Sequence, residues 1–544
     1  MLAEIKRGVA SFLSIINPGL WALFFLALAV SLLFLVIRID RLPMMLLYYC
    51  ADGFDTFLSI KITKDIGIWG VIPYFDMPVS LFGYAPVLFG LLGAGLDYLL
   101  RDAALSMFVL YALTDACIFL LLYFRFFRKQ PLHMKLLLCS FFVFNMMFEN
   151  LFPFGQRMRQ QLAILLGLLL FLQENPIATF ALSLLAMLAQ PFTGFLMSLS
   201  YVIHVVEKTS IPSFLKRNAG TIIPVLLAVL AAIPFYQGLV SGFFGAPHYY
   251  SCNNLSTLLL PSIFYWPFCL FCLLFMYDNR RLLGASEAFA ILLIFFVPAA
   301  FVFLDITKDF LPFPVFDFVL RLMSITCPYV FLNVGAFLLL ASLGYKKYKL
   351  GQLPITLLLL ISLLNLSVSS IYLAYELPLQ RVALYQDGVS FLEANDIHNV
   401  KTLEADAFDQ GGKIFLAPRN PRFSLQGYSI MKGANLHFVD EMNLPPEMSR
   451  GRTNILTVGL LTAILQKNES CSEMTGALRD ADVDAIAYEI TPSVLISPER
   501  HSQVIAAFKD TDFLDRCSLE LIEQEEPGLL TNQYQIVYKI KNGN

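Results

Sequence analysis

The chain has 544 residues, of which 57% are hydrophobic and only 15% are charged. These proportions exclude a soluble globular protein for most of the chain and indicate a membrane protein. The formal net charge of −3 contains no basic excess, so nucleic acid is not an expected partner.

Long apolar runs recur from the N-terminus to residue 375. A bilayer core about 30 Å thick needs about 20 apolar residues per helix. The basic start MLAEIKRGVA precedes the first run, as in a signal peptide, but no convincing cleavage site follows, so we expect a retained signal-anchor helix. About eleven membrane-spanning helices are predicted, at 20–37, 102–124, 137–152, 162–174, 177–190, 192–206, 220–238, 257–277, 286–304, 323–343 and 353–375.

Basic loops set the expected orientation in the membrane. With a cytoplasmic N-terminus, the cytoplasmic loops with clustered Lys and Arg are 125–135, 206–217, 277–284 and 344–352. A further span at 79–100 would invert every later loop. We therefore predict that 79–100 is an interfacial helix on the outer surface. The alternative is a true span whose partner has been missed.

Residues 376–544 have an ordinary charge density and contain alternating strand-like and helix-like runs. They predict an extracytoplasmic α/β domain after a transmembrane domain of residues 1–375. Strands are expected at VKTLEA, KIFLAP, DAIAYEI and YQIVYKI. An oxidising compartment would allow a Cys471–Cys517 or a Cys50–Cys252 disulfide, although free buried thiols fit equally well. Cys269 and Cys272 lie in an apolar run and are read as two buried small residues.

The first outer loop, residues 38–101, concentrates acidic residues in an otherwise apolar region. Its carboxylates are Asp40, Asp52, Asp55, Asp65, Asp76 and Asp97, with Lys61 and Lys64 among them. Other predicted outer loops contribute Glu149, Arg157, Arg159, His248 and Arg321. Ionisable groups near a membrane are costly unless they serve a site or a pathway. A set of mixed sign can deprotonate a hydroxyl through a carboxylate and hold a phosphate through Arg.

Each of these residues also has a simpler interpretation. Asp52 and Asp55 share one face of a helix over GFDTFLSIKITKDIG, but an amphipathic helix at the head groups would merely solvate its acids and point Lys61 and Lys64 to water. Arg321 could snorkel to the interface, and Glu149 could end a helix in water.

Several motifs of the first outer loop resemble those of membrane glycosyltransferases of the GT-C class. Asp55 precedes an aromatic and apolar helix, IPYFD follows at 72–76, and GYAPVLFGLL at 83–92 resembles the Tyr-Pro-Pro-Leu-type motif, with Ala85 in place of one proline. The resemblance in layout covers about residues 20–375. It implies transfer of a sugar from a polyprenyl-phosphate donor to a lipid, glycan or protein acceptor on the outer face.

The resemblance also implies residue roles. Asp55 matches the catalytic acid, Asp52 is the competing register, and Asp76 lies in the same site. Arg321, with Arg157 and Arg159, would bind the donor phosphate, and Glu149, His248 and Tyr84 would line the pocket. Asp55 and Glu149 could hold Mg²⁺ or Mn²⁺, although the class does not require a metal. The C-terminal domain contains no Trp and thus no WWDYG signature, which disfavours transfer of a whole glycan to asparagine.

Two other functions stay open on the sequence. One is a lipid-linked sugar flippase or a solute transporter. Against it, no inverted repeat is found and the charges cluster outside the spans. The other is a surface-assembly membrane protein without catalytic activity.

Overall fold

A computed structural model describes the helical part of the chain and much of the C-terminal sheet. The described residues are 2–49, 87–147, 158–207, 214–236, 255–307, 328–345, 350–375, 389–410, 413–419, 436–438, 482–492, 519–525 and 534–540, with shorter pieces that include 56–57, 59–61 and 63–64.

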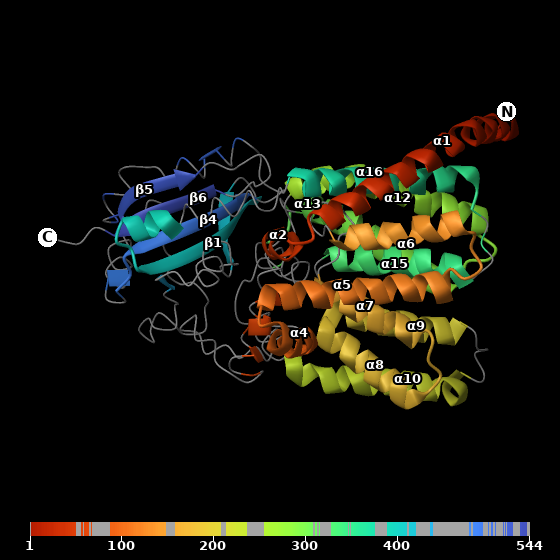
Figure 1. Ribbon diagram of the computed structural model, residues 1–544, viewed down its shortest axis with the longest axis horizontal. Coiled ribbons are helices and arrows are strands. Elements are labelled where there is room, and N and C mark those ends of the chain that lie inside the picture. The colour runs from red at the N-terminus through yellow and green to blue at the C-terminus, as the bar shows by residue number, and fades with distance from the viewer. Residues whose placement is uncertain are drawn as a thin grey trace.

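The N-terminal part of the protein is a bundle of apolar helices (Figure 1). In chain order the helices are α1 (Leu2–Ile37), α2 (Leu42–Tyr49), α4 (Val87–Leu100), α5 (Ala103–Leu121) with its π-helical extension η1 (Leu122–Phe126), α6 (Leu132–Met147), α7 (Met158–Leu170), α8 (Pro176–Ala189), α9 (Pro191–Glu207), α10 (Phe214–Ala232) with the 3-10 turn η3 (Ile233–Tyr236), α12 (Leu255–Asn279), α13 (Ala285–Thr307), α15 (Pro328–Tyr345) and α16 (Gln352–Tyr375). Each apolar run that predicts a span coincides with one of these helices, so the prediction of a polytopic helical architecture is confirmed at the level of the helices.

Three helices within the described residues are long and apolar enough to cross a membrane. They cover Ile16–Ile37, Ala103–Phe126 and Gln352–Tyr375. The other apolar stretches found there, such as Pro267–Asn279 within α12 and Ala285–Phe296 within α13, comprise 10 to 17 residues each. The protein therefore has the helices of an integral membrane protein, whereas the number of eleven spans stays a prediction. Large apolar side chains are exposed on α1 and α10, among them Leu26, Val36 and Leu230, as expected for surfaces in contact with lipid.

The first and last helices of the bundle lie side by side and run in the same direction. Among the hydrogen bonds between these two segments, three join residues 335 or 336 positions apart. They are Asn17 Nδ2 to Gln352 Oε1 (2.6 Å), Ser31 Oγ to the Leu366 carbonyl (3.1 Å) and Arg38 Nη2 to the Ala374 carbonyl (3.5 Å). Because α1 and α16 are parallel, the start of the first outer loop and the start of the C-terminal domain emerge at the same end of the bundle.

The basic loops gather at the opposite end. Gln130, in the turn between η1 and α6, donates a hydrogen bond to the carbonyl of Leu343 near the end of α15 (2.8 Å). The ring of Tyr348, which follows α15, packs edge-on against Phe275 of α12. Three of the four predicted cytoplasmic loops therefore meet near the N-terminal ends of the α1 and α16 spans. The sheet lies beyond the other end, next to α2 and α4 (Figure 1).

The C-terminal domain contains a mixed six-stranded sheet of order β2-β1-β4-β6-β5, with β3 paired to β1. The strands are β1 (Asn399–Gln410), β2 (Lys413–Arg419), β3 (His437–Phe438), β4 (Ala485–Pro492), β5 (Leu519–Glu525) and β6 (Tyr534–Ile540). β1 and β4 are parallel, whereas β1–β2, β4–β6 and β5–β6 are antiparallel. The four predicted strands are β1, β2, β4 and β6, and β5 was missed.

The described cysteines follow two of the sequence predictions. Cys269 and Cys272 are free and buried, which confirms their interpretation as small core residues. Cys517 is disulfide-bonded, and its partner lies outside the described residues. Cys50, Cys252 and Cys471 also lie outside the described residues.

Candidate functional site

Most of the sequence-predicted site residues lie outside the part of the chain that the structure describes. These are Asp52, Asp55, Asp76, Tyr84, Glu149, Arg157, His248 and Arg321. Arg159 is the second residue of α7, and its backbone is helical. The described residues next to these positions are those that directly follow Asp55 and the helices that pack against them.

The segment that begins directly after Asp55 is helical and buried. Residues 56–57, 59–61 and 63–64 are helical. The Thr56 and Phe57 side chains are 0% and 6% exposed, and Phe57 belongs to a core cluster with Met107 of α5 and Ala163 of α7. The chain at the candidate catalytic acid is thus continuous with the core of the bundle, because its next two residues are buried there. The described residues of this segment therefore pack into the protein core, whereas Asp52 and Asp55, whose solvation the head-group alternative concerns, lie outside the described residues.

Two glycines of α4 allow this segment to approach closely. A Cβ on Gly90 would lie 2.9 Å from Thr63 Oγ1 and 3.3 Å from the carbonyl oxygen of Ser59. A Cβ on Gly93 would lie 2.5 Å from Ile60 Cδ1, well inside the normal carbon–carbon contact of about 3.5 to 4.0 Å. Only glycine at these positions leaves room for the segment, so segment 56–64 packs directly against α4.

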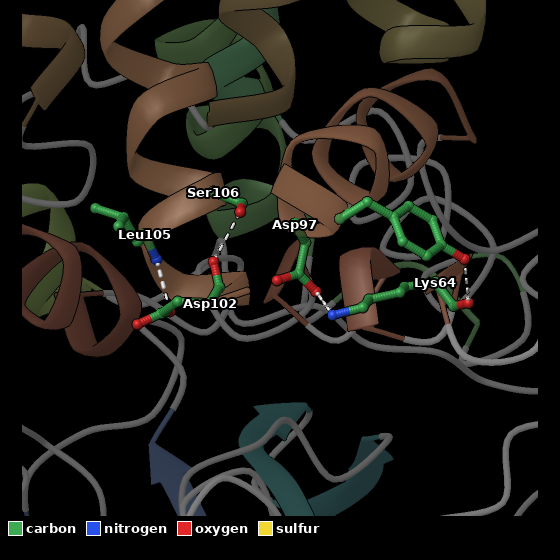
Figure 2. Close-up of polar contacts among 6 residues, drawn as sticks. Lys64, Asp97, Asp102, Leu105 and Ser106 are labelled. Atoms are coloured by element: carbon green, nitrogen blue, oxygen red, sulfur yellow. Dashed lines mark hydrogen bonds and ion pairs between the residues drawn. The ribbon is translucent and has the colours of Figure 1, made fainter. Parts of the chain in front are cut away.

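An ion pair joins the C-terminal end of segment 56–64 to α4. Lys64 Nζ lies 2.9 Å from Asp97 Oδ2 on α4, with 28% of the Lys64 side chain and 4% of the Asp97 side chain exposed (Figure 2). The Tyr98 hydroxyl donates a hydrogen bond of 3.2 Å to the Lys64 carbonyl. The sequence-based expectation that Lys64 points to water is therefore wrong, since a buried carboxylate on the neighbouring helix draws it inward. Asp97 is occupied by this pair and is not a candidate base.

A sharp corner joins α4 to α5. Arg101 has a positive φ of 56°, and Asp102 caps α5 by accepting a hydrogen bond of 2.9 Å from the Leu105 backbone N–H (Figure 2). The Ser106 hydroxyl donates to the Asp102 carbonyl at 2.7 Å. An N-cap of this kind typically stabilises a helix by about 1 kcal/mol. With 14 residues, α4 is about 21 Å long and shorter than the bilayer core.

A layer of buried polar side chains lies below this corner, in the helices themselves. Gln161 of α7 donates a hydrogen bond of 2.9 Å to the Tyr111 hydroxyl of α5, and Tyr111 is hydrogen-bonded to the side chain of Asp115. The neighbouring Gln160 accepts a long hydrogen bond of 3.4 Å from Asn333 of α15. All five side chains are at most 6% exposed. The layer therefore links α5, α7 and α15.

The prediction of site residues missed this buried polar layer. Its signal was present, because Asp115, Gln160, Gln161 and Asn333 interrupt apolar runs in which polar residues are costly. Asp115 has no ion-pair partner among the described residues, and its Oδ1 atom is buried without a hydrogen bond. A buried carboxyl group of this kind marks either a specific structural contact or a pathway for a cation.

Metal ligands are not brought together in the described region. No group of three or more His, Cys, Asp or Glu side chains that could hold a metal ion occurs among the described residues. The two ligands suggested by sequence, Asp55 and Glu149, lie outside them. Binding of Mg²⁺ or Mn²⁺ by these two residues thus stays a prediction.

Comparison with family models, with curated proteins and with solved structures finds no match to this chain.

Proposed function

We propose that the protein is a membrane glycosyltransferase that takes a sugar from a polyprenyl-phosphate donor at the end of the bundle that bears the sheet domain. The observation that carries this proposal is the seating of segment 56–64 on α4. Catalysis requires a reacting group to be held in a fixed geometry. The residues directly after Asp55 are anchored by a glycine-mediated contact and a largely buried ion pair, as a catalytic segment requires.

In the proposed reaction, the Asp55 carboxylate accepts the proton of an acceptor hydroxyl, with Asp52 as the alternative base. The hydroxyl oxygen then bonds to the anomeric carbon while the bond from that carbon to the phosphate oxygen breaks. The electron pair leaves with the polyprenyl phosphate. Arg321, with Arg157 and Arg159, would stabilise the charge that develops on the phosphate through bidentate hydrogen bonds. Attack opposite the leaving group inverts the anomeric configuration.

The position of the sheet domain supports this arrangement. The parallel packing of α1 and α16 brings the domain to the end from which the first loop emerges. The disulfide of Cys517 favours an oxidising compartment, as expected for the outer side of a cell membrane. A domain in this position can recognise the acceptor, whether it is a lipid, a glycan or a protein.

A carrier is the second candidate, and Asp115 is the observation that favours it. Transporters place ionisable residues within the membrane-spanning bundle, as this protein does in α5. In a coupled carrier, Asp115 would exchange a proton or bind a cation, and Tyr111 and Gln161 would supply hydrogen-bonding groups along the pathway. The glycosyltransferase remains the preferred function because segment 56–64, which directly follows the candidate base Asp55, is anchored on α4.

Sugar transfer can be tested on the purified full-length protein in nanodiscs. A labelled polyprenyl-phosphate hexose should release polyprenyl phosphate only when an acceptor is present. Asp55→Asn should lower the rate by about 10²-fold to 10⁴-fold, the usual contribution of a general base. Asp40→Asn is the matched control, because Asp40 is an exposed carboxylate of the same loop whose side chain is 74% accessible. Its rate should equal that of the wild type.

The other outcomes discriminate between the alternatives. Full activity of Asp55→Asn with loss of activity in Asp52→Asn would assign the base to Asp52. An unchanged rate in both variants would refute a first-loop carboxylate as base. Absence of release, combined with solute transport into vesicles that Asp115→Asn abolishes, would replace the transferase by the carrier.

A further inference from the structure

A cavity among the described residues lies at the end of the bundle opposite the sheet domain. It has a volume of about 690 Å³ and lies between α1, α6, α15 and α16. We call it the basal cavity, and six of its lining residues carry the argument: Asn17, Trp21, Gln130, His133, Tyr348 and Gln352. A volume of this size is within the range of small-molecule sites, roughly 300 to 1,000 Å³.

The depth of the basal cavity is set by the helices that form it. The apolar spans Ile16–Ile37 and Gln352–Tyr375 both begin at its wall. Asn17 and Gln352 therefore mark the boundary between the apolar span and water. Trp21, one turn further along α1, also lines the cavity, and tryptophan is enriched at this level of a bilayer. The cavity thus opens where lipid head groups lie.

The walls of the cavity divide into a polar and an aromatic part. Asn17 Nδ2 donates to Gln352 Oε1 at 2.6 Å, and the Thr356 hydroxyl donates to Asn17 Oδ1 at 2.8 Å. This pairing orients the Gln352 amide so that its two N–H donors remain available for an acceptor. On the other side, the Trp21 and His133 rings meet edge to face with centroids 4.9 Å apart. Hydrogen-bond donors and amphipathic rings together suit a polar head group attached to an acyl chain.

The chain that leads into the cavity lining on the α6 side is basic. Arg125, Arg128 and Lys129 are exposed and, within the described residues, form no ion pair. Lys129 directly precedes Gln130 of the lining. On the α16 side, Asp278 lies close to Gly351, the neighbour of Gln352, because its Oδ2 would lie 2.9 Å from a Cβ on Gly351. The net positive charge next to the opening favours an anionic ligand.

We propose that the basal cavity binds the head group of an anionic phospholipid, with the phosphate near Arg128 and Lys129 and the acyl chains along α1. Its depth in the membrane, its donors and the basic residues next to its lining each select for this ligand class. Basic pockets between membrane helices bind such head groups in general. The site is separate from the proposed transferase site, since the two lie at opposite ends of the bundle (Figure 1).

Lipid binding can be measured on the full-length protein by native mass spectrometry. Phosphatidylglycerol is titrated against phosphatidylcholine of the same acyl chains and against free glycerol phosphate. Arg128→Gln/Lys129→Gln should weaken phosphatidylglycerol binding by about 30-fold, if each basic residue contributes about 1 kcal/mol near an anionic group. The matched control is Arg280→Gln/Arg281→Gln, which removes the same charge at the same end of the bundle. Arg128 and Lys129 directly precede the lining residue Gln130, whereas no residue next to Arg280 or Arg281 in the chain lines the cavity.

A second variant tests the cavity independently of charge. Leu350→Trp places a larger ring in the lining of the cavity and keeps every basic residue, so it should also weaken the preference for phosphatidylglycerol. Thermal unfolding of each variant verifies that the fold is retained. Equal binding of phosphatidylglycerol and phosphatidylcholine would overturn the proposal. So would equal weakening by the control pair, which would indicate general surface attraction. Competition by glycerol phosphate at equal concentration would assign the site to a free phosphate ester and refute a lipid.

Discussion

Replacing Gly93 by alanine adds one methyl group at the closest approach between α4 and segment 56–64. The new Cβ would lie 2.5 Å from Ile60 Cδ1 and closer still to Cγ1, and Ile60 is fully buried and has no free space to turn into. Overpacking of this kind costs about 1 to 3 kcal/mol, whereas alanine gains about 1 kcal/mol over glycine in helix propensity. The expected net loss is therefore about 0 to 2 kcal/mol.

Gly95 of the same helix provides the control for Gly93→Ala. No atom lies within 4 Å of a Cβ built on Gly95, so Gly95→Ala should stabilise α4 by about 0.5 to 1 kcal/mol. Thermal unfolding in detergent, together with hydrogen exchange of segment 56–64, measures both variants. Gly93→Ala should speed exchange in the segment, and Gly95→Ala should not.

A double mutant separates this contact from other effects. Ile60→Ala removes the atoms that the new methyl group would strike, so it should cost less in the Gly93→Ala background than in the wild type. Equal stability and equal exchange in Gly93→Ala and Gly95→Ala would refute the view that α4 seats the segment. The same result would remove the main support for an anchored catalytic loop.

Three further changes test other parts of the fold. Lys64→Met should destabilise the protein by about 2 to 4 kcal/mol because it leaves the buried Asp97 carboxylate unpaired. Asp97→Asn should cost less because Lys64 can reach water. Equal shifts of the melting temperature in the two variants would contradict this asymmetry. Burial raises the pKa of Tyr538 above its usual 10.0, so the stability that it contributes is present below pH 10 and lost as the pH rises further. Absorbance at 295 nm should detect the ionisation of Tyr538 at a pH above that of an exposed tyrosine. Tyr538→Phe should remove the extra pH dependence of unfolding above pH 10. Reduction of the Cys517 disulfide should lower the stability of the sheet domain by about 2 to 4 kcal/mol, and an unchanged melting temperature after thiol treatment would argue against its structural role.

The helices could be predicted from the sequence because hydrophobic periodicity and length are local properties of the chain. The same holds for β1, β2, β4 and β6, whose β-branched and aromatic residues favour strands. β5 has the sequence LELIEQE, in which three glutamates weaken the strand signal. Its pairing with β6 decides its structure, and this partner is not visible in the local pattern.

The candidate site was harder to predict because its contacts join residues that are distant in the sequence. Lys64 and Asp97 each fit a solvated surface when considered alone, and only the close packing of segment 56–64 on α4 brings them together. Tyr111 and Gln161 belong to separate apolar runs, so their hydrogen bond could not be predicted from either run. A polar residue within an apolar run nevertheless indicates a buried polar contact, and Asp115 could have been predicted as a candidate site residue on that basis.

The parallel contact between α1 and α16 has a consequence for biosynthesis. α1 leaves the ribosome first, yet Asn17 and Ser31 find their partners only after residues 352–370 have been made. Until then these polar groups face lipid or a temporary helper, and the first helix cannot take its final place in the bundle. Insertion would therefore be completed by a late docking of the ends of the chain, and a product truncated before α16 should be a preferred substrate for membrane quality-control proteases.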